Sequence, residues 1–415
     1  MIFALAASTH WSPTVTDATR MQVSPHPRTL ASPRARLVFL DWLRAFAALL
    51  VVWDHLVGQW LSVQRRGWVP LGLVDRFVTG PLSIIQNFGW LGVAMFFLIS
   101  GFIISHVAVT ESGWQFALKR LLRIYPPLVL AIIVTLGADA IRRGTGVVDS
   151  LSGGLPVAHS VHDVMVSTSL ANYLMSPQPI VVGVAWTLVI EMTFYVLVLI
   201  TRRLLNWTVP AMATWIVLAV VGLVLLTSHR WGDSYFLFSV SVSFVPLLVL
   251  GQIIWLRWSS RIGWLQFGLL SATAWVLFVQ GLELIQPRFL QPDQAYGPSI
   301  VVAYAIFVLM LLNNDRLIRP SFVKFLANRS YSLYLLHGAL GLFVLDALGT
   351  RLPYTLALLV AVAVVVLGTQ ISYQFVEAPS QRLARSLAAK VPRRRLAGDE
   401  VDAAFPVVAT VSREP

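Results

Sequence analysis

Long apolar runs recur along almost the whole chain. Each is about 17 to 25 residues long, which is the length that an α-helix needs to cross a hydrocarbon layer of about 30 Å at 1.5 Å per residue. With 57% hydrophobic and only 12% charged residues, the chain is far from soluble proteins in composition. We therefore predict an all-α membrane protein, a polytopic bundle of about ten transmembrane helices. The predicted spans are residues 37–61, 86–109, 125–141, 180–201, 209–227, 235–256, 264–284, 298–313, 332–349 and 354–376.

Four segments modify this pattern. Residues 114–125, WQFALKRLLRIY, mix apolar and basic side chains, which predicts a short amphipathic helix in the membrane interface between the second and third spans. The third span is short because Gly137 and Asp139 interrupt it, and Pro246 lies in the middle of the sixth. Residues 142–179 form the longest predicted loop.

Basic residues gather on one side of the predicted spans. The segments on the side of the N-terminus hold most of the 31 Lys and Arg residues, and such residues collect in cytoplasmic loops. We therefore predict a multi-pass inner-membrane protein with both termini cytoplasmic. Its predicted parts are a flexible N-terminal tail (1–36), a transmembrane domain (37–378) and a basic C-terminal tail (379–415). This asymmetry explains the net charge of +12, so we predict no nucleic-acid partner.

The chain has no cysteine. A disulfide framework, a thiolate nucleophile and Cys-ligated metals are therefore excluded. Any acyl transfer by this chain must avoid a cysteine thioester intermediate. We predict no metal and no bound cofactor.

The first predicted helix carries three ionisable residues, Asp41, Arg44 and His55. At 100° per residue, eleven steps return to about 20° and fourteen to about −40°, so the three side chains share one face. Arg44 and His55 are separated by roughly 16 Å along the axis. Because charge inside a membrane is expensive and usually marks a site or a pathway, we predict that they line one passage. A snorkelling Arg44 and a packing or interfacial His55 are the alternatives.

Six motifs follow one another in a recognisable order. The first helix reads LVFLDWLRAFAALLVVWDHL, with an Arg, ten residues and a His; the others are FGWLGVAMFFLISGFIIS, KRLLRIYPP, AWTLVIEMTFYVL, RSYSLYLLH and FVEAPSQRL. Together they resemble the acyltransferase 3 family, integral-membrane O-acyltransferases that act on surface polysaccharides and related acceptors. The resemblance covers residues 37 to about 385.

The resemblance implies a membrane-embedded O-acyltransferase. Its donor would be acyl-CoA, with acetyl-CoA as the expected form, bound on the cytoplasmic side of the lipid bilayer. Its acceptor would be a hydroxyl of an extracytoplasmic sugar, polysaccharide or lipid-linked glycan. A proton-coupled transporter or exporter of a lipid-linked or small glycoside is the alternative, since buried Arg, His and Glu also build proton relays. No motif specifies the acceptor, the acyl length or the oligomeric state.

The chain departs from the family pattern at two positions. Ala94 stands where many relatives have an acid after Gly-Val, and Met192 replaces the usual second acid after Glu191. Neither position can supply a carboxylate here. We see no appended esterase-like domain, so we expect the membrane domain or a separate partner to complete the transfer.

The ionisable residues of the predicted spans can be assigned to separate roles in acyl transfer. Acyl transfer from a thioester to a hydroxyl needs a base, donors for the oxyanion and a clamp for the carrier's phosphates. His55 is the best base by side-chain type, since its unperturbed pKa is about 6.5. Glu191 would orient His55 or pair with Arg44, and Asp41 completes the predicted catalytic set. A structural ion pair is the alternative for Glu191.

Arg120 and Arg123 are three residues apart and so are neighbours on a helix surface. Together with Tyr125 they are predicted to bind the donor phosphates; ordinary cytoplasmic basic charge is the alternative. The remaining cavity candidates are Trp186, Tyr195, Ser100, Tyr334 and His337. Helix packing is the favoured alternative for Ser100, and a core or interfacial stripe is equally compatible with the last two.

Overall fold

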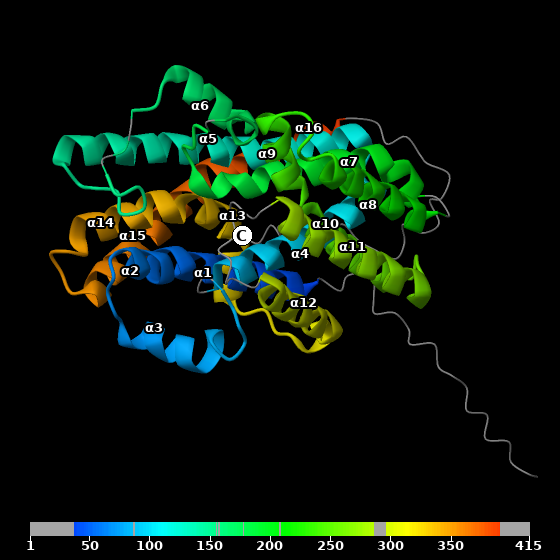
Figure 1. Ribbon diagram of the computed structural model, residues 1–415, viewed down its shortest axis with the longest axis horizontal. Helices are drawn as coiled ribbons and strands as arrows, with labels where there is room; N and C mark the ends of the chain where they lie inside the picture. Colours follow the sequence, from blue (N-terminus) through cyan, green and yellow to red (C-terminus); the bar gives the residue numbers. More distant parts are fainter. Residues whose placement is uncertain are drawn as a thin grey trace, which may run out of the picture. The chain divides into compact units, whose positions relative to one another are not determined.

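The computed structural model describes residues 37–390 except 86–87, 155, 157, 177, 207–208 and 286–295. The predicted N-terminal tail, and residues 391–415 of the predicted C-terminal tail, lie outside the described residues. In the described part, all regular elements are helices (Figure 1). The long ones are α1 (Val38–Trp53), α4 (Gly89–Thr110), α5 (Gly113–Thr145), α7 (Trp186–Asn206), α8 (Pro210–Leu226), α10 (Val245–Trp258), α11 (Trp264–Ile285), α12 (Tyr296–Leu312), α13 (Ser321–His337) and α15 (Tyr354–Ser372).

Shorter helical segments extend or connect these helices. They are η1 (Asp54–Gln59), α2 (Trp60–Val63), α3 (Val69–Val74), η2 (Asp75–Thr79), α6 (Val161–Thr168), η4 (Ala171–Leu174), η5 (Gly183–Ala185), α9 (Asp233–Val242), η6 (Asn314–Arg316), η7 (Gly338–Leu342), α14 (Phe343–Leu348), η8 (Tyr373–Glu377) and α16 (Ala378–Ala389). Four of them, η1, η2, η7 and η8, are π-helical turns.

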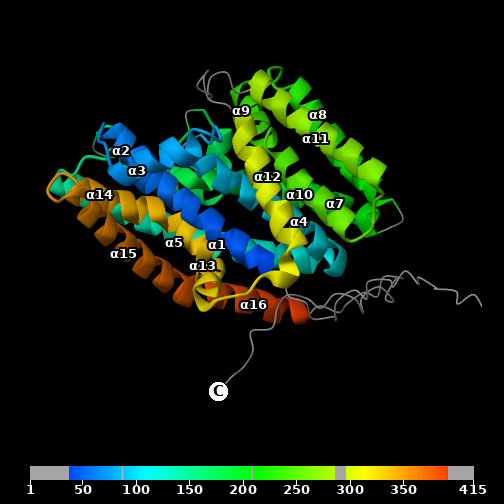
Figure 2. The same ribbon diagram turned by 90° about the horizontal axis from the view of Figure 1, so that it is seen from below.

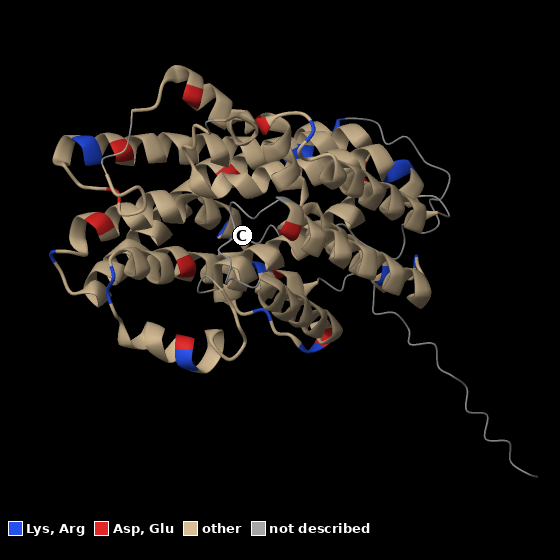
Figure 3. Ribbon diagram, viewed as in Figure 1, with Lys and Arg blue, Asp and Glu red and all other residues tan. Residues whose placement is uncertain are grey.

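The predicted membrane character is confirmed. Among the described residues, eight helices are long and apolar enough to cross a membrane, and two shorter apolar helices, α8 and α12, coincide with the other predicted spans. Most of the length of each long helix carries no Lys, Arg, Asp or Glu (Figure 3). The chain is therefore a multi-pass membrane protein, with the count of ten spans as an approximation.

Helix α5 differs from its prediction. Residues 114–125 do not form a separate interfacial helix but the first turns of one continuous helix. The helix begins at Gly113 because Ser112 and Gln115 form a capping box, each side chain bonding the other's backbone N–H at 3.2 Å. Gly137 does not end it, since one glycine costs a helix only about 1 kcal/mol. Asp139 and Arg142 are consequently helical residues.

Helix α4 occupies the middle of the packing. It contacts α1, α7, α10 and α12 (Figure 2). Glycines permit the closest of these approaches: a Cβ on Gly101 would fall on the backbone carbonyl of Leu248 in α10, and a Cβ on Gly251 on that of Leu98. Small residues at helix interfaces allow such close packing in membranes. The contact fixes the face of α4 that lines the cavity described below.

Changing Gly101 to Ala is expected to destabilise the protein, because the added Cβ would clash with the backbone of Leu248 in α10. A backbone cannot move aside as easily as a flexible side chain. We expect a loss of about 1–3 kcal/mol, the usual cost of overpacking, measured as a lower melting temperature in detergent. Gly268→Ala in α11 is the matched control, since a Cβ there meets nothing within 4 Å. Equal melting temperatures in the two variants would contradict the close α4–α10 contact.

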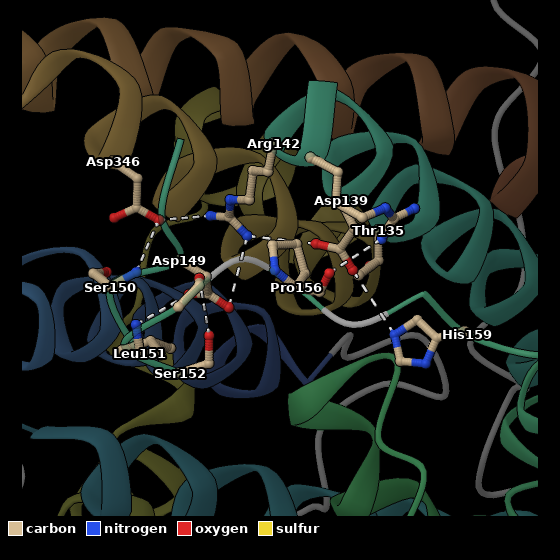
Figure 4. Close-up of polar contacts among 12 residues, drawn as sticks. Thr135, Asp139, Arg142, Asp149, Ser150, Leu151, Ser152, Pro156, His159 and Asp346 are labelled. Carbon is tan, nitrogen blue, oxygen red and sulfur yellow. Dashed lines mark hydrogen bonds and ion pairs between the residues drawn. The ribbon is translucent and has the colours of Figure 1, made fainter. Parts of the chain in front are cut away.

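A buried polar cluster joins the long loop to the helix ends (Figure 4). Arg142 at the end of α5 donates to Asp346 of α14 at 2.6 Å and lies 3.6 Å from Asp139 and 3.9 Å from Asp149 of the loop. Trp60 of α2 donates to the other oxygen of Asp346 at 3.0 Å. These contacts join α2, α14, the end of α5 and the loop that follows α5 at one end of the bundle.

The second half of this loop is held by Tyr173. Its hydroxyl donates to the carbonyl of Val182 at 2.7 Å. Burial raises the pKa of Tyr173, so the hydroxyl keeps the proton that it donates. The hydrogen bond fixes the segment that enters α7, on which Glu191 lies.

Candidate active site

A cavity lies among α1, α4, α5, α7 and α13. The wall formed by α4 is mostly apolar, whereas the other helices supply most of the charged and hydroxyl groups. The lining residues are Arg44, Val93, Phe96, Phe97, Ile99, Ser100, Ile103, Ile104, Arg120, Arg123, Thr187, Leu188, Glu191, Tyr195, Ser330, Tyr331 and Tyr334. The cavity thus collects residues from both halves of the chain.

Three arginines converge on this cavity, Arg44 from α1 and Arg120 and Arg123 from α5. They are close enough for the charges of Arg120 and Arg123 to act on Arg44. Within the described residues, no hydrogen bond or ion pair is made by any of the three guanidinium groups. The one carboxylate that lines the cavity, Glu191, does not balance them. Because buried cations are costly unless paired, the arrangement favours an anionic ligand.

Glu191 is held by two hydroxyl groups. Its Oε1 accepts a hydrogen bond from Ser100 Oγ of α4 and another, at 2.5 Å, from Tyr195 Oη. Glu191 and Tyr195 are four residues apart on α7, so they lie one turn apart on the same face. The second carboxylate oxygen remains to act on the arginines, and the charge of Glu191 reaches both Arg120 and Arg123.

Two histidines face each other away from the arginines. The rings of His55 and His337 lie 4.8 Å apart between centroids in an edge-to-face arrangement. Each Nδ1–H donates to the carbonyl four residues earlier, at 3.0 Å for His55 and 3.1 Å for His337. In the neutral ring this leaves a lone pair on Nε2, the atom that can take a proton. His337 Nε2 is buried and has no hydrogen-bond partner among the described residues.

Both histidines lie at π-helical turns. His55 belongs to η1, and His337 is the last residue before η7. The two turns pack against each other. Such turns are rare and are frequent at functional sites, because they change the direction in which side chains leave a helix.

Tyr334 connects the histidine pair to the cavity. It lines the cavity, and its ring centroid lies 6.1 Å from that of His337, one turn further along α13. Its hydroxyl donates to the carbonyl of Val184 at 3.1 Å and lies 3.0 Å from Thr187 Oγ1. The cavity and the histidines are therefore neighbours separated by one aromatic side chain.

Comparison with known proteins identifies the fold family. The sequence model of the Acyltransferase domain family matches residues 37–373. The chain belongs to the acyltransferase 3 family. It is therefore an enzyme that transfers acyl groups. The resemblance read from the six motifs is confirmed.

Two named relatives of this acyltransferase 3 protein show what it is similar to. Nodulation protein 10 of Rhizobium leguminosarum bv. viciae is 27% identical over 84% of this chain and 95% of its own length. O-acetyltransferase OatA of Staphylococcus aureus is 23% identical over 88% of this chain, which spans 60% of the length of that relative. No solved structure matches the chain significantly.

The cavity of this acyltransferase 3 protein brings most of the predicted site residues together. Those that line it are Arg44, Ser100, Arg120, Arg123, Glu191, Tyr195 and Tyr334. Five others lie elsewhere. Besides the two histidines, Asp41 forms an ion pair with Arg319 at 2.5 Å, and Trp186 packs among aromatic rings of α4 and the α9–α10 turn. Tyr125, the third predicted phosphate ligand, is not among the lining residues.

Two features of this acyltransferase 3 site were missed by the sequence analysis. Phe96 lines the cavity, yet inside an apolar span nothing distinguishes it from lipid-facing phenylalanines. Glu377 is 3% exposed and accepts a hydrogen bond from Ser332 Oγ at 2.6 Å, and its charge acts on Arg123. The sequence could have pointed to Glu377, because this acid lies in the FVEAPSQRL motif directly after an apolar span. Among the described residues, no group of three or more His, Asp or Glu side chains is placed to hold a metal ion.

Proposed function

We propose that the chain is a membrane-embedded O-acyltransferase that moves an acetyl or short acyl group from acyl-CoA to a hydroxyl of an extracytoplasmic sugar, polysaccharide or lipid-linked glycan. The relative from Staphylococcus aureus is named an O-acetyltransferase, which supports an oxygen acceptor. The concentration of basic residues on the side where α1 begins supports an inner-membrane protein with cytoplasmic termini. The donor would then enter from that side.

The observation that carries the proposal is the trio of Arg44, Arg120 and Arg123 in one cavity. Coenzyme A carries several phosphate charges, and an arginine can bind phosphate through two parallel hydrogen bonds. A guanidinium group that makes no internal ion pair is available for such a contact. The apolar wall of α4 beside the arginines suits the uncharged acyl end of the same donor.

The histidine pair supplies the base. Nε2 of His55 takes the proton from the acceptor hydroxyl, while the oxygen of that hydroxyl forms a bond to the thioester carbonyl carbon. The tetrahedral intermediate collapses, the carbon–sulfur bond breaks, and the sulfur of coenzyme A takes the proton back from the imidazolium. The products are the ester and free coenzyme A, so atoms and charges balance without a covalent enzyme intermediate. Glu191 and the arginines stabilise charge at the donor side of this reaction.

Removing one arginine of the clamp tests the donor. Arg120→Ala and Arg123→Ala are each expected to weaken binding of acetyl-CoA by about tenfold or more, the value of one or two hydrogen bonds to a charged group. Arg→Lys at either position should recover only part of this, since an ammonium cannot make the paired contact. The measurement is the dissociation constant of acetyl-CoA for purified protein in detergent.

Arg203→Ala is the matched control, because Arg203 is an exposed basic residue on the same predicted side of the membrane. It should bind acetyl-CoA as the wild type does. Unchanged affinity in both the Arg120 and the Arg123 variants would reduce these residues to signals of topology and remove the main support for an acyl-CoA donor.

A further inference from the structure

Two aromatic side chains of the cavity lining, Phe96 and Tyr334, pack on each other. Ile103 of α4 and Arg120 of α5 each lie seven residues from the short turn that joins the two helices, so they lie at about the same depth, roughly 10 Å from it. Phe96 precedes Ile103 by seven residues in α4 and so lies roughly 10 Å further from this turn. The cavity therefore has one end at Arg120 and Arg123 and, beyond it, a level at which Phe96 lies. Arg44 lies close to that second level, because Phe39 of α1 packs on Phe102 and Ala47 of α1 lies against Gly92 of α4.

Phe96 packs on the residue that separates the cavity from the histidines. Its ring lies 5.6 Å from that of Tyr334, edge to face, and both residues line the cavity. Tyr334 is 7% exposed and its hydroxyl is fixed by Thr187 and the carbonyl of Val184. Tyr334 is thus held in place on two sides, while Phe96 has no polar anchor and contributes only its volume.

We propose that Phe96 limits the length of the acyl group that the cavity accepts. This inference rests on the proposed function, in which the phosphates of acyl-CoA bind the arginines. A donor anchored at Arg120 and Arg123 extends along the apolar wall of α4, with its thioester toward Tyr334 and the histidines beyond. The acyl group then occupies the space next to Phe96. A longer chain would have to displace the ring, so Phe96 is a specificity-determining residue for a short acyl group.

The test compares acyl-CoA esters that differ only in chain length. The dissociation constants of acetyl-CoA, butyryl-CoA and hexanoyl-CoA are measured for purified wild-type protein and for Phe96→Ala. The wild type should bind acetyl-CoA most tightly. Phe96→Ala should shift the ratio of butyryl-CoA to acetyl-CoA affinity by about tenfold or more toward butyryl-CoA, the lower end of what one methylene decides in an apolar pocket.

Ile103→Ala is the matched control. It removes an apolar side chain from the same α4 wall at the end where Arg120 and Arg123 lie, so it should leave the ratio unchanged whatever it does to overall affinity. An equal shift in this variant would overturn the assignment to Phe96, since any loss of volume would then suffice. If Phe96→Ala does not fold, Phe96→Leu should give a smaller shift in the same direction, and an unchanged ratio in that variant would overturn the inference.

Different results would contradict the length limit and the proposal that acyl-CoA is the donor. If acetyl-CoA binds but chain length has no effect in any Phe96 variant, the length limit is wrong and the donor proposal stands. If the wild type binds none of the three esters, the donor proposal itself fails and the length limit fails with it.

Discussion

His55→Ala is expected to lower the rate of acyl transfer by roughly 10²- to 10⁴-fold, the usual contribution of a general base. The physical reason is that Nδ1–H of His55 is committed to the carbonyl of Val51, which leaves Nε2 as the basic atom. Binding of acetyl-CoA should change little, because His55 does not line the arginine cavity. The measurement is coenzyme A release from acetyl-CoA with candidate sugar acceptors, beside the dissociation constant of the donor.

The exposed loop residue His229 provides the control, and His229→Ala should keep the wild-type rate. Near-normal turnover in His55→Ala would eliminate His55 as the base. The geometry then leaves His337, whose buried Nε2 has no partner among the described residues, as the next candidate. A loss that appears only in His337→Ala would assign the base to that residue.

Arg142→Leu is expected to destabilise the protein by about 3–5 kcal/mol, the cost of removing one partner from a buried ion pair. The side chain of Asp346 is 1% exposed and that of Arg142 is 7% exposed. Without the guanidinium group, Asp346 and Asp139 would keep buried negative charge. The N–H donors of Trp60 and of Ser150 (Figure 4) to Asp346 are uncharged and do not neutralise it. The free energy of unfolding is measured by chemical denaturation in detergent.

Arg143 supplies the matched control one residue further along α5, since its side chain is exposed. Arg143→Leu should unfold at nearly the wild-type denaturant concentration. The same midpoint for both variants would mean that the cluster contributes no net stability. Asp346→Asn should lie between them, because the amide still accepts a hydrogen bond from Trp60 but no longer attracts Arg142.

The sequence predicted those features that depend on neighbours along the chain. The spans follow from the lengths of the apolar runs, and the spacing of four residues places Tyr195 one turn from Glu191 on the same helix face. The spacing of three residues likewise makes Arg120 and Arg123 neighbours on the surface of α5. The hydrogen bonds that Glu191 accepts from Ser100 and Tyr195 were not predicted, since the sequence suggested His55 or Arg44 as its partner. The order of motifs identified the family, because motif spacing records a shared fold even where individual residues differ, as at Ala94 and Met192.

Only the tertiary structure decided which residues of other helices each helix face contacts. Asp41, Arg44 and His55 were predicted to share one helix face, and Arg44 and His55 to line one passage. In the structure Arg44 lines the cavity, Asp41 pairs with Arg319 and His55 faces His337. Side chains on one helix face meet different neighbours at different depths, and these partners lie more than 270 residues away in the sequence. The contacts of Arg142 with Asp346 and of Phe96 with Tyr334 are likewise set by helix packing. Hydrophobic periodicity specifies which face is buried, whereas the side chains that meet in the core depend on how the helices are stacked.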